Sequence, residues 1–215
     1  MTGPGAAWWA LVSAAVAPVA LIGGWLIAAS VQPRGYDATR QTISALAAHG
    51  ATDRWIMTAG LAVLGACHVV TALGLRAARR AGRFLLAAGG MATLVVAAAP
   101  QPVHGSAPVH VGAAFMGFLA LALWPLAAGG THTRAALGRR SCRTVTAVLL
   151  ALLGWLGVEL GGDGLLGVAE RSLAGAEALW PLVVVLSVRT VGAAAAVGTM
   201  RSATPRRSRR GPHRP

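Results

Sequence analysis

Long apolar segments alternate with short polar ones along the whole chain of 215 residues. A membrane-spanning helix needs about 20 mostly apolar residues to cross a hydrocarbon core of roughly 30 Å. Six segments approach or exceed this length, and each predicts a transmembrane helix. Their expected ranges are 7–30, 55–78, 82–99, 109–128, 145–160 and 176–200. The pattern therefore predicts an all-α polytopic membrane protein, in which residues 1–200 form a single bundle of six helices.

The composition favours this class of protein over the class that the charge alone suggests. Hydrophobic residues make up 55% of the chain and charged residues 12%, with a formal net charge of +13. A strongly basic chain is often a nucleic-acid-binding protein. A mean hydropathy of +0.63, however, leaves more apolar surface than a soluble protein of this size can hide. We therefore expect membrane lipids, and no nucleic acid, as partners.

All 19 basic residues are arginines, and their distribution predicts the orientation. Fourteen of them follow the second, fourth and sixth predicted spans, on one side of the bundle. Four lie on the other side, and one lies within the sixth span; these are Arg34, Arg40, Arg54, Arg171 and, within the span, Arg189. Cytoplasmic loops carry an excess of basic residues. With six spans, both termini are therefore expected in the cytoplasm.

Residues 201–215 form an arginine-, proline- and serine-rich tail with almost no apolar content. Such a composition predicts disorder, because the segment cannot bury apolar surface. Basic clusters beside a span also attract anionic lipid, at about 1 kcal/mol per residue. We expect the tail to be a cytoplasmic topology anchor, with binding of anionic lipid as a further role.

Ionisable residues gather at the predicted outer face. His104 and His110 flank a proline-bounded loop between the third and fourth spans, His49 and Asp53 end the first outer loop, and Glu159 lies near the outer end of the fifth span. An ionisable residue at that depth needs a partner or a polar cavity. The cluster could form an acid–base site, a metal site, or a salt-bridge network that only orders the loops. The spacing of the two histidines is not one of the usual short zinc spacings.

The first outer loop, residues 31–54, adds further candidates. Asp37 is expected to cap a short helix that runs to about Ala48, on which Arg40 and Ser44 share a face. The same loop holds Tyr36, the only tyrosine of the chain. Tyr36, Arg40 and Ser44, together with the His49 and Asp53 side chains, are therefore candidate substrate-binding residues.

An enzyme built on these residues would use His104 and His110 as acid–base groups. Glu159 and Asp37 would orient them, and Arg40 would hold an anionic head group. The sequence contains none of the usual ATPase, metalloprotease or serine-hydrolase motifs. Whether the chain is an enzyme, which cofactor it would use and how many copies assemble all stay open.

A second candidate site lies inside the membrane. His68 and Arg189 are each 13 residues from the expected outer end of their span, Trp55 and Ala176 respectively. At 1.5 Å per residue, both would lie roughly 20 Å deep. They could line a polar cavity that holds an anionic head group or relays protons, as in a small carrier. Alternatively, Arg189 extends toward the cytoplasm and His68 bonds to a neighbour.

The stretch YDATRQTISALAAHGATDRWIMTAGLAVLG, residues 36–65, resembles a bacterial membrane family known as domain of unknown function 998. The family pattern has the form P/Y-D-x-x-x-x-T-I-S-x-L, followed by a Gly/Ala turn and an R-W entry into the second span. The matching residues are Asp37, Thr42, Ile43, Ser44, Leu46, Arg54 and Trp55. The segments PQPVHGSAPVH and GVAERSLAGAEALWPLVVVLSVR also resemble later parts of actinobacterial members.

Many members have Ser-Asp-Leu-Gly where this chain has Ser44-Ala45-Leu46-Ala47, so no role of that aspartate is carried over. The resemblance implies a six-span bundle in the bacterial plasma membrane. The Ile-Ser-x-Leu segment is also similar to the Ile-Ser-Asp segment of eukaryotic Frag/DRAM/Sfk proteins, some of which are linked to lipid-anchor remodelling. This similarity implies a role connected with lipids.

The sequence thus predicts an integral membrane protein that binds or modifies a lipid or isoprenoid-like amphiphile, in a pocket open to the outer face. Two alternatives stand beside it. One is a small transporter or proton-coupled carrier that uses His68 and Arg189. The other is a structural or partner-binding subunit without chemistry.

Overall fold

The computed structural model describes residues 5–105, 107–130, 135–162 and 164–202. Within these ranges the fold is all-α, and six helices are long and apolar enough to cross a membrane. They are α1 (Trp8–Ser30), α2 (Trp55–Gly74), α3 (Arg80–Ala98), α4 (Pro108–Ala128), α5 (Arg139–Glu159) and α6 (Leu166–Ser202). Two short 3-10 helices, η1 (Ser44–Ala47) and η2 (Ala135–Leu137), lie in the connections. The prediction of a six-helix membrane protein is confirmed. The predicted tail lies outside the described residues, except for its first two positions, which continue α6.

Three helix boundaries differ from those expected. Helix α2 ends at Gly74 rather than at residue 78, and α5 begins at Arg139 rather than at residue 145. The largest difference is in α6, which begins at Leu166 rather than at residue 176, so most of residues 161–175 belongs to the same helix as the sixth span. Apolar length identifies only the part of a helix that fills the hydrocarbon layer. Polar residues such as Glu170 and Arg171 can extend the same helix beyond it when other parts of the protein bond them.

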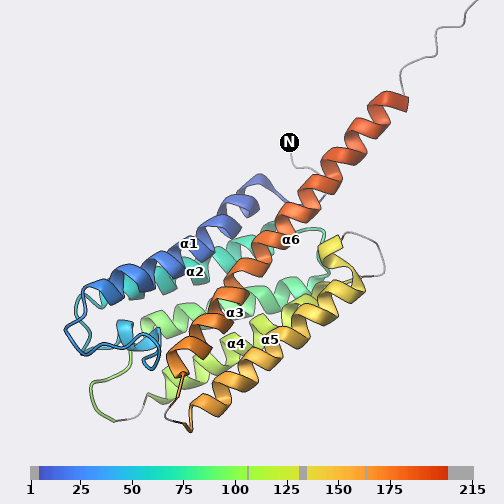
Figure 1. Cartoon of the computed structure of the whole chain (residues 1–215). Coiled ribbons are helices and arrows are strands. Elements are labelled where there is room, and N and C mark those ends of the chain that lie inside the picture. Colours follow the sequence, from blue (N-terminus) through green and yellow to red (C-terminus); the bar gives the residue numbers. More distant parts are fainter. Residues whose placement is uncertain (1–4, 106, 131–134, 163, 203–215) are drawn as a thin grey trace, which may run out of the picture.

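The helices pack in chain order around a ring. Each helix contacts the next one along the chain, and α6 closes the ring by packing against α1 as well as α5. Figure 1 shows α6 crossing the other helices obliquely and extending beyond them. One end of the bundle carries the α2–α3 and α4–α5 connections, and we call it the arginine-rich end. The opposite end carries the loop between α1 and α2, and we call it the first-loop end.

Two glycines let α2 and α3 approach each other in the middle of the bundle. A Cβ atom at Gly65 or at Gly90 would lie 2.6 Å from the backbone oxygen of the other residue. A Cβ atom at Gly90 would also lie 2.9 Å from the Cβ atom of His68. Small residues are a common means of close helix packing in membranes. The backbone contact therefore fixes His68 against α3.

Candidate functional site

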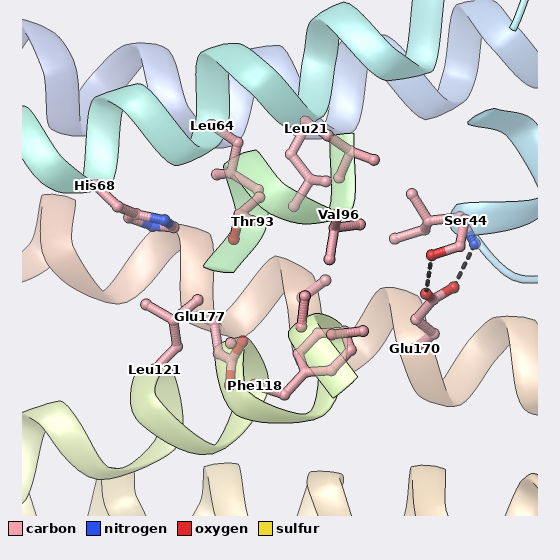
Figure 2. Close-up of a pocket in the computed structure, with 16 residues that line it drawn as sticks. Leu21, Ser44, Leu64, His68, Thr93, Val96, Phe118, Leu121, Glu170 and Glu177 are labelled. Carbon is pink, nitrogen blue, oxygen red and sulfur yellow. Dashed lines mark hydrogen bonds between the residues drawn. The ribbon is translucent and has the colours of Figure 1, made fainter. Parts of the chain in front are cut away.

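A small cavity lies between the helices, and it is lined mainly by apolar side chains of α1, α2, α3, α4 and α6 (Figure 2). Its volume is about 50 Å³. One water molecule needs roughly 10–15 Å³ of such space, whereas sites for drug-sized ligands occupy about 300–1,000 Å³. The cavity therefore has room for a few water molecules and not for a lipid head group. Its polar lining residues are Ser44, His68, Thr93, Glu170 and Glu177.

Glu177 is one of two polar groups in this lining without a hydrogen-bond partner among the described residues. It lies on α6 with 1% of its surface exposed. Neither carboxylate oxygen has a hydrogen-bond partner among the described residues. Figure 2 shows its side chain directed toward α4, near Leu121 and Phe118. An unpaired carboxylate in such surroundings is costly, and protonation or a hydrogen-bonding ligand would relieve that cost.

His68 faces the same cavity from α2. It is 1% exposed, and neither ring nitrogen has a partner within the described ranges. A neutral imidazole always carries one N–H donor and one acceptor nitrogen. Thr93 on α3 also lines the cavity, but its hydroxyl already donates to the Gly89 carbonyl oxygen at 2.9 Å. The unfilled hydrogen-bonding capacity of the cavity therefore belongs to His68 and Glu177.

Glu170 bounds the cavity at the first-loop end. This α6 residue is 6% exposed. Its carboxylate accepts hydrogen bonds from the backbone N–H of Ile43 and, at 3.4 Å, from the Ser44 hydroxyl (Figure 2). Ser44 begins η1, so the carboxylate holds this short helix over the cavity. The first loop thus supplies one wall of the cavity.

Arg171, the next residue of α6, holds the same loop from outside. Its Nη1 donates to the carbonyl oxygens of Ala38 and Gln41, both at 2.8 Å, and its Nη2 donates to the Tyr36 hydroxyl at 2.6 Å. The start of α6 can approach the first loop closely because residue 167 is a glycine. A Cβ atom there would lie 2.4 Å from the oxygens of both Ala38 and Gln41. Adjacent acidic and basic side chains therefore fasten the first loop to the start of α6.

Two groups of the first loop have shifted pKa values. Burial raises the pKa of Tyr36 above its ordinary 10.0, although the charge and hydrogen bond of Arg171 act in the opposite direction. The pKa of Asp37 is lowered, because the Thr39 hydroxyl and backbone N–H donate to its carboxylate at 2.6 and 2.8 Å. Asp37 therefore orders a turn of the loop, where we expected the cap of a helix running to Ala48.

A larger hollow lies on the other side of η1, at the surface of the first-loop end, and we call it the outer hollow. Its volume is about 470 Å³. The lining comes from the first loop and from the connection between α3 and α4, and includes Arg34, Tyr36, Gln41, Leu46 and Val103. Helix η1 therefore lies between this hollow and the buried cavity, because Ser44 lines the cavity and the next two residues of η1 line the hollow.

The structure brings two of the predicted site residues, Ser44 and His68, to the buried cavity. Tyr36 lines the outer hollow. Other predicted residues lie at the first-loop end and line neither space; Asp37 is half-buried, and the exposed ones are Arg40, His49, Asp53 and His104. Arg40 pairs with Asp37 at 3.7 Å in a solvent-exposed contact, so it does not share the buried face of Ser44.

His110 and Glu159 have separate local partners. His110 is buried at the start of α4, where its Nδ1 is 2.8 Å from the Ala99 carbonyl oxygen. Glu159 ends α5 and accepts hydrogen bonds from the Trp155 indole at 3.0 Å and from the Leu165 backbone N–H at 2.6 Å. Among the described residues, no three His, Cys, Asp or Glu side chains are grouped to hold a metal ion.

Arg189 does not line the cavity with His68, as one prediction had it, and its side chain extends instead toward the arginine-rich end, as in the alternative. It is exposed near the arginine-rich end, and its Nη1 donates to the Ala6 carbonyl oxygen at 3.2 Å. The expected depth was counted from Ala176, but α6 begins at Leu166. Ten further residues of helix carry Arg189 past the cavity by about 15 Å.

Glu170, Arg171 and Glu177 are the residues that sequence reasoning missed, because they were placed in or beside an outer loop. A signal was present in the sequence. Glu170 and Glu177 are seven residues apart, which places two residues of a helix on one face. A helix beginning near Leu166 would therefore have pointed both carboxylates at the bundle.

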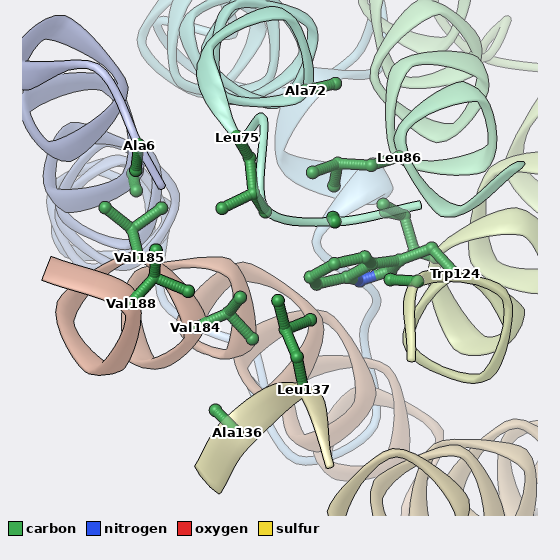
Figure 3. Packing of buried hydrophobic residues seen from close by; sticks show 14 residues of the cluster. Ala6, Ala72, Leu75, Leu86, Trp124, Ala136, Leu137, Val184, Val185 and Val188 are labelled. Atoms are coloured by element: carbon green, nitrogen blue, oxygen red, sulfur yellow. The ribbon is translucent and has the colours of Figure 1, made fainter. Parts of the chain in front are cut away.

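The cavity does not continue as an open space to the arginine-rich end. Buried apolar side chains fill the interior there, with Trp124 at 0% exposure packed among residues of several helices (Figure 3). Figure 3 shows Leu75, Leu86, Leu137 and Val184 around its ring. Apolar packing around Trp124 therefore lies between the cavity and this end, where the buried Ser13 and Thr71 hydroxyls bond to each other at 2.8 Å.

Fold and site together define a multi-pass integral membrane protein, in which a water-sized cavity holds buried acidic and imidazole groups. A profile of the family described as "Protein of unknown function (DUF998)" matches residues 7–187. The chain belongs to this family, and the match covers all six membrane-spanning segments almost completely. No curated protein and no solved structure matches the chain.

Proposed function

We propose that the protein is a small proton-coupled carrier of the bacterial plasma membrane, with its proton-binding site at Glu177 and His68. One observation carries this proposal. Two buried ionisable side chains without hydrogen-bond partners among the described residues line the same water-sized cavity. Ionisable residues within membrane spans are expensive, and they commonly mark proton relays and ion pathways. Glu177 takes the role that the sequence suggested for Arg189.

The chemistry needs only a proton and a few water molecules. A protonated Glu177 is neutral and compatible with the apolar lining, and its proton can pass through water to an imidazole nitrogen of His68. Histidine is suited to this exchange because its two nitrogens can donate and accept in turn. A cavity of about 50 Å³ provides space for such a water bridge.

The position of the cavity supports proton entry from the first-loop end. Glu170 and Ser44 line the cavity there, and the outer hollow begins on the other side of the same short helix. Apolar packing around Trp124 separates the cavity from the opposite end. With the arginine-rich end in the cytoplasm, protons would enter from the outer face, past Glu170, toward Glu177.

Infrared difference spectroscopy of the protein in lipid vesicles at two pH values tests the proton-binding site. We expect the carbonyl band of protonated carboxyl groups to change with pH in the wild type and to lose the part that belongs to Glu177 in Glu177→Gln, while the part that belongs to the buried Glu170 stays. Ser187→Ala is the matched control on α6, because the Ser187 hydroxyl bonds only to its own helix at Val184. A band of the same intensity in Glu177→Gln and in the wild type, or no pH-dependent carboxyl band at all, would contradict the proposal.

Vesicles containing a trapped pH-sensitive dye test whether the site moves protons. Under an imposed membrane potential, we expect faster proton entry than in empty vesicles. Both Glu177→Gln and His68→Ala should return the rate to that of empty vesicles, while Ser187→Ala keeps the wild-type rate. Equal rates in the wild type and in Glu177→Gln would show that the buried site carries no proton flux.

The outer hollow supports a second candidate, the binding of a lipid or isoprenoid-like amphiphile. Its volume of about 470 Å³ lies in the range of small-ligand sites. Arg34 and Tyr36 offer polar contacts, and the exposed Val103 offers an apolar one. Neither His104 nor Glu159 lines this hollow, which favours binding over catalysis here. Mass spectrometry of lipids retained by the purified protein tests this candidate: Arg34→Gln should lower retention, and Arg54→Gln, outside the lining, should not.

A further inference from the structure

The arginine-rich end carries a hollow that is separate from the buried cavity and from the outer hollow. Its volume is about 620 Å³. Three arginines line it, Arg79, Arg139 and Arg143, together with Gly129 and Gly130. Arg79 lies in the connection before α3, and the other two arginines lie in the first turns of α5, so the tertiary fold brings them to one place.

Backbone contacts hold the α2–α3 and α4–α5 connections together. The Arg79 N–H donates to the Ala128 carbonyl oxygen at 3.3 Å, which joins the start of α3 to the end of α4. The Gly130 N–H donates to the Leu137 carbonyl oxygen at 3.2 Å, which closes the connection just before α5. Arg139 begins α5, and Arg143 lies one turn further on the same face.

The three guanidinium groups have no hydrogen bond or ion pair with any described residue. Arg83, at the same end of the bundle, differs because it donates to the Ala72 and Leu73 carbonyl oxygens at 2.7 and 2.9 Å. The described acidic residues all lie at the first-loop end or in the buried cavity. Nothing in the described chain therefore balances the three charges around the hollow, and a bound anion would.

We propose that this hollow binds the phosphate group of an anionic ligand through Arg79, Arg139 and Arg143. Planar guanidinium groups match phosphate oxygens with paired hydrogen bonds. The positive end of α5 adds a favourable potential at its first turn. A Cβ atom at Gly130 would meet nothing within 4 Å, so the backbone leaves the hollow open for a ligand. Anionic phospholipids and soluble phosphorylated molecules both supply this group.

Thermal unfolding of the full chain in detergent micelles tests the site, because a ligand that binds only the folded state raises its stability. One set of micelles contains phosphatidylglycerol and the other phosphatidylcholine. A parallel set contains inorganic phosphate or chloride at equal ionic strength, since exposed charges are screened by salt. The site variant is Arg79→Gln/Arg139→Gln/Arg143→Gln. The control is Arg76→Gln/Arg80→Gln/Arg140→Gln, which removes equal charge at the same end but outside the lining.

We expect phosphatidylglycerol to raise the unfolding temperature of the wild type and of the control, and to have no effect on the site variant. The same pattern with inorganic phosphate instead would identify a soluble phosphorylated ligand. Equal shifts in both triple variants, or no shift in the wild type with either probe, would overturn the proposal. If the site variant does not fold, Arg143→Gln alone tests the site. It should lower the apparent affinity for phosphatidylglycerol or inorganic phosphate by at least about tenfold, because one charge-assisted pair of hydrogen bonds is lost.

Discussion

The Ser44 hydroxyl in the first loop donates to Glu170 Oε1 on α6 at 3.4 Å, across 126 positions of the sequence. The other carboxylate oxygen accepts the Ile43 backbone N–H. Both donors belong to the T-I-S segment that the family pattern contains. The carboxylate therefore gives this segment a physical role, which is to fix η1 between the buried cavity and the outer hollow.

Removing the Glu170 carboxylate should destabilise the protein more than removing the Ser44 hydroxyl. Glu170→Ala leaves the buried Ile43 N–H unpaired, and an unsatisfied buried donor costs about 1–3 kcal/mol. Ser44→Ala removes only a long hydrogen bond, so its effect should be smaller. Thermal unfolding in detergent, followed by tryptophan fluorescence, measures both. Equal unfolding temperatures for the two variants would mean that the backbone contact contributes little.

The ionisation of Tyr36 should be displaced to higher pH in the folded protein. Tyr36 is the only tyrosine, so ultraviolet absorbance of the phenolate reports this residue alone. Burial raises its pKa above 10.0, so the folded state binds this proton more tightly than the unfolded state does. The stability that this proton contributes is fully present below pH 10.0 and is lost as the pH rises through the folded pKa.

In denaturant the Tyr36 titration midpoint should return to about 10.0. Arg171→Gln should raise the midpoint of the folded protein further, because the charge and hydrogen bond of Arg171 lower the pKa. Arg171→Lys keeps the charge and should raise it less. A folded wild type that titrates at the same pH as the denatured chain would contradict the burial of the hydroxyl.

Arg171 should matter more for the first loop than Arg40 does. The guanidinium of Arg171 joins two loop carbonyls and the Tyr36 hydroxyl, and a lysine ammonium cannot reproduce this planar set of donors. Arg171→Lys should therefore speed tryptic cleavage of the loop, at Arg34 or Arg40. Arg40→Gln removes only an exposed ion pair and should leave cleavage at Arg34 unchanged. The reverse order would show that Asp37 and Arg40 hold the loop.

Glycine at position 90 should be required for packing, whereas glycine at position 154 should not. Gly90→Ala places a Cβ atom 2.6 Å from the Gly65 oxygen, so α2 and α3 must separate beside His68. Such overpacking costs typically 1–3 kcal/mol. A Cβ atom at Gly154 meets nothing within 4 Å, and alanine there favours the helix by about 1 kcal/mol. Thermal unfolding should show a loss for Gly90→Ala and none for Gly154→Ala.

The amino-acid sequence by itself determined the class of protein and the number of helices. Crossing a membrane depends on the length and apolarity of each segment separately, because every backbone polar group of a span is satisfied within its own helix. The sequence also predicted that Ser44 and His68 belong to a site. These residues stand out locally, one in a motif and one as a lone histidine within an apolar span.

Only the tertiary structure determined which polar groups face one another. His68 shares its cavity with Glu177, and the first loop is held by Glu170 and Arg171, because α6 begins ten residues earlier than its apolar segment suggests. That start depends on hydrogen bonds to a loop more than 100 residues away in the chain. Apolar length sets where a helix crosses the membrane, whereas packing and long-range hydrogen bonds set where it starts and which face it turns inward.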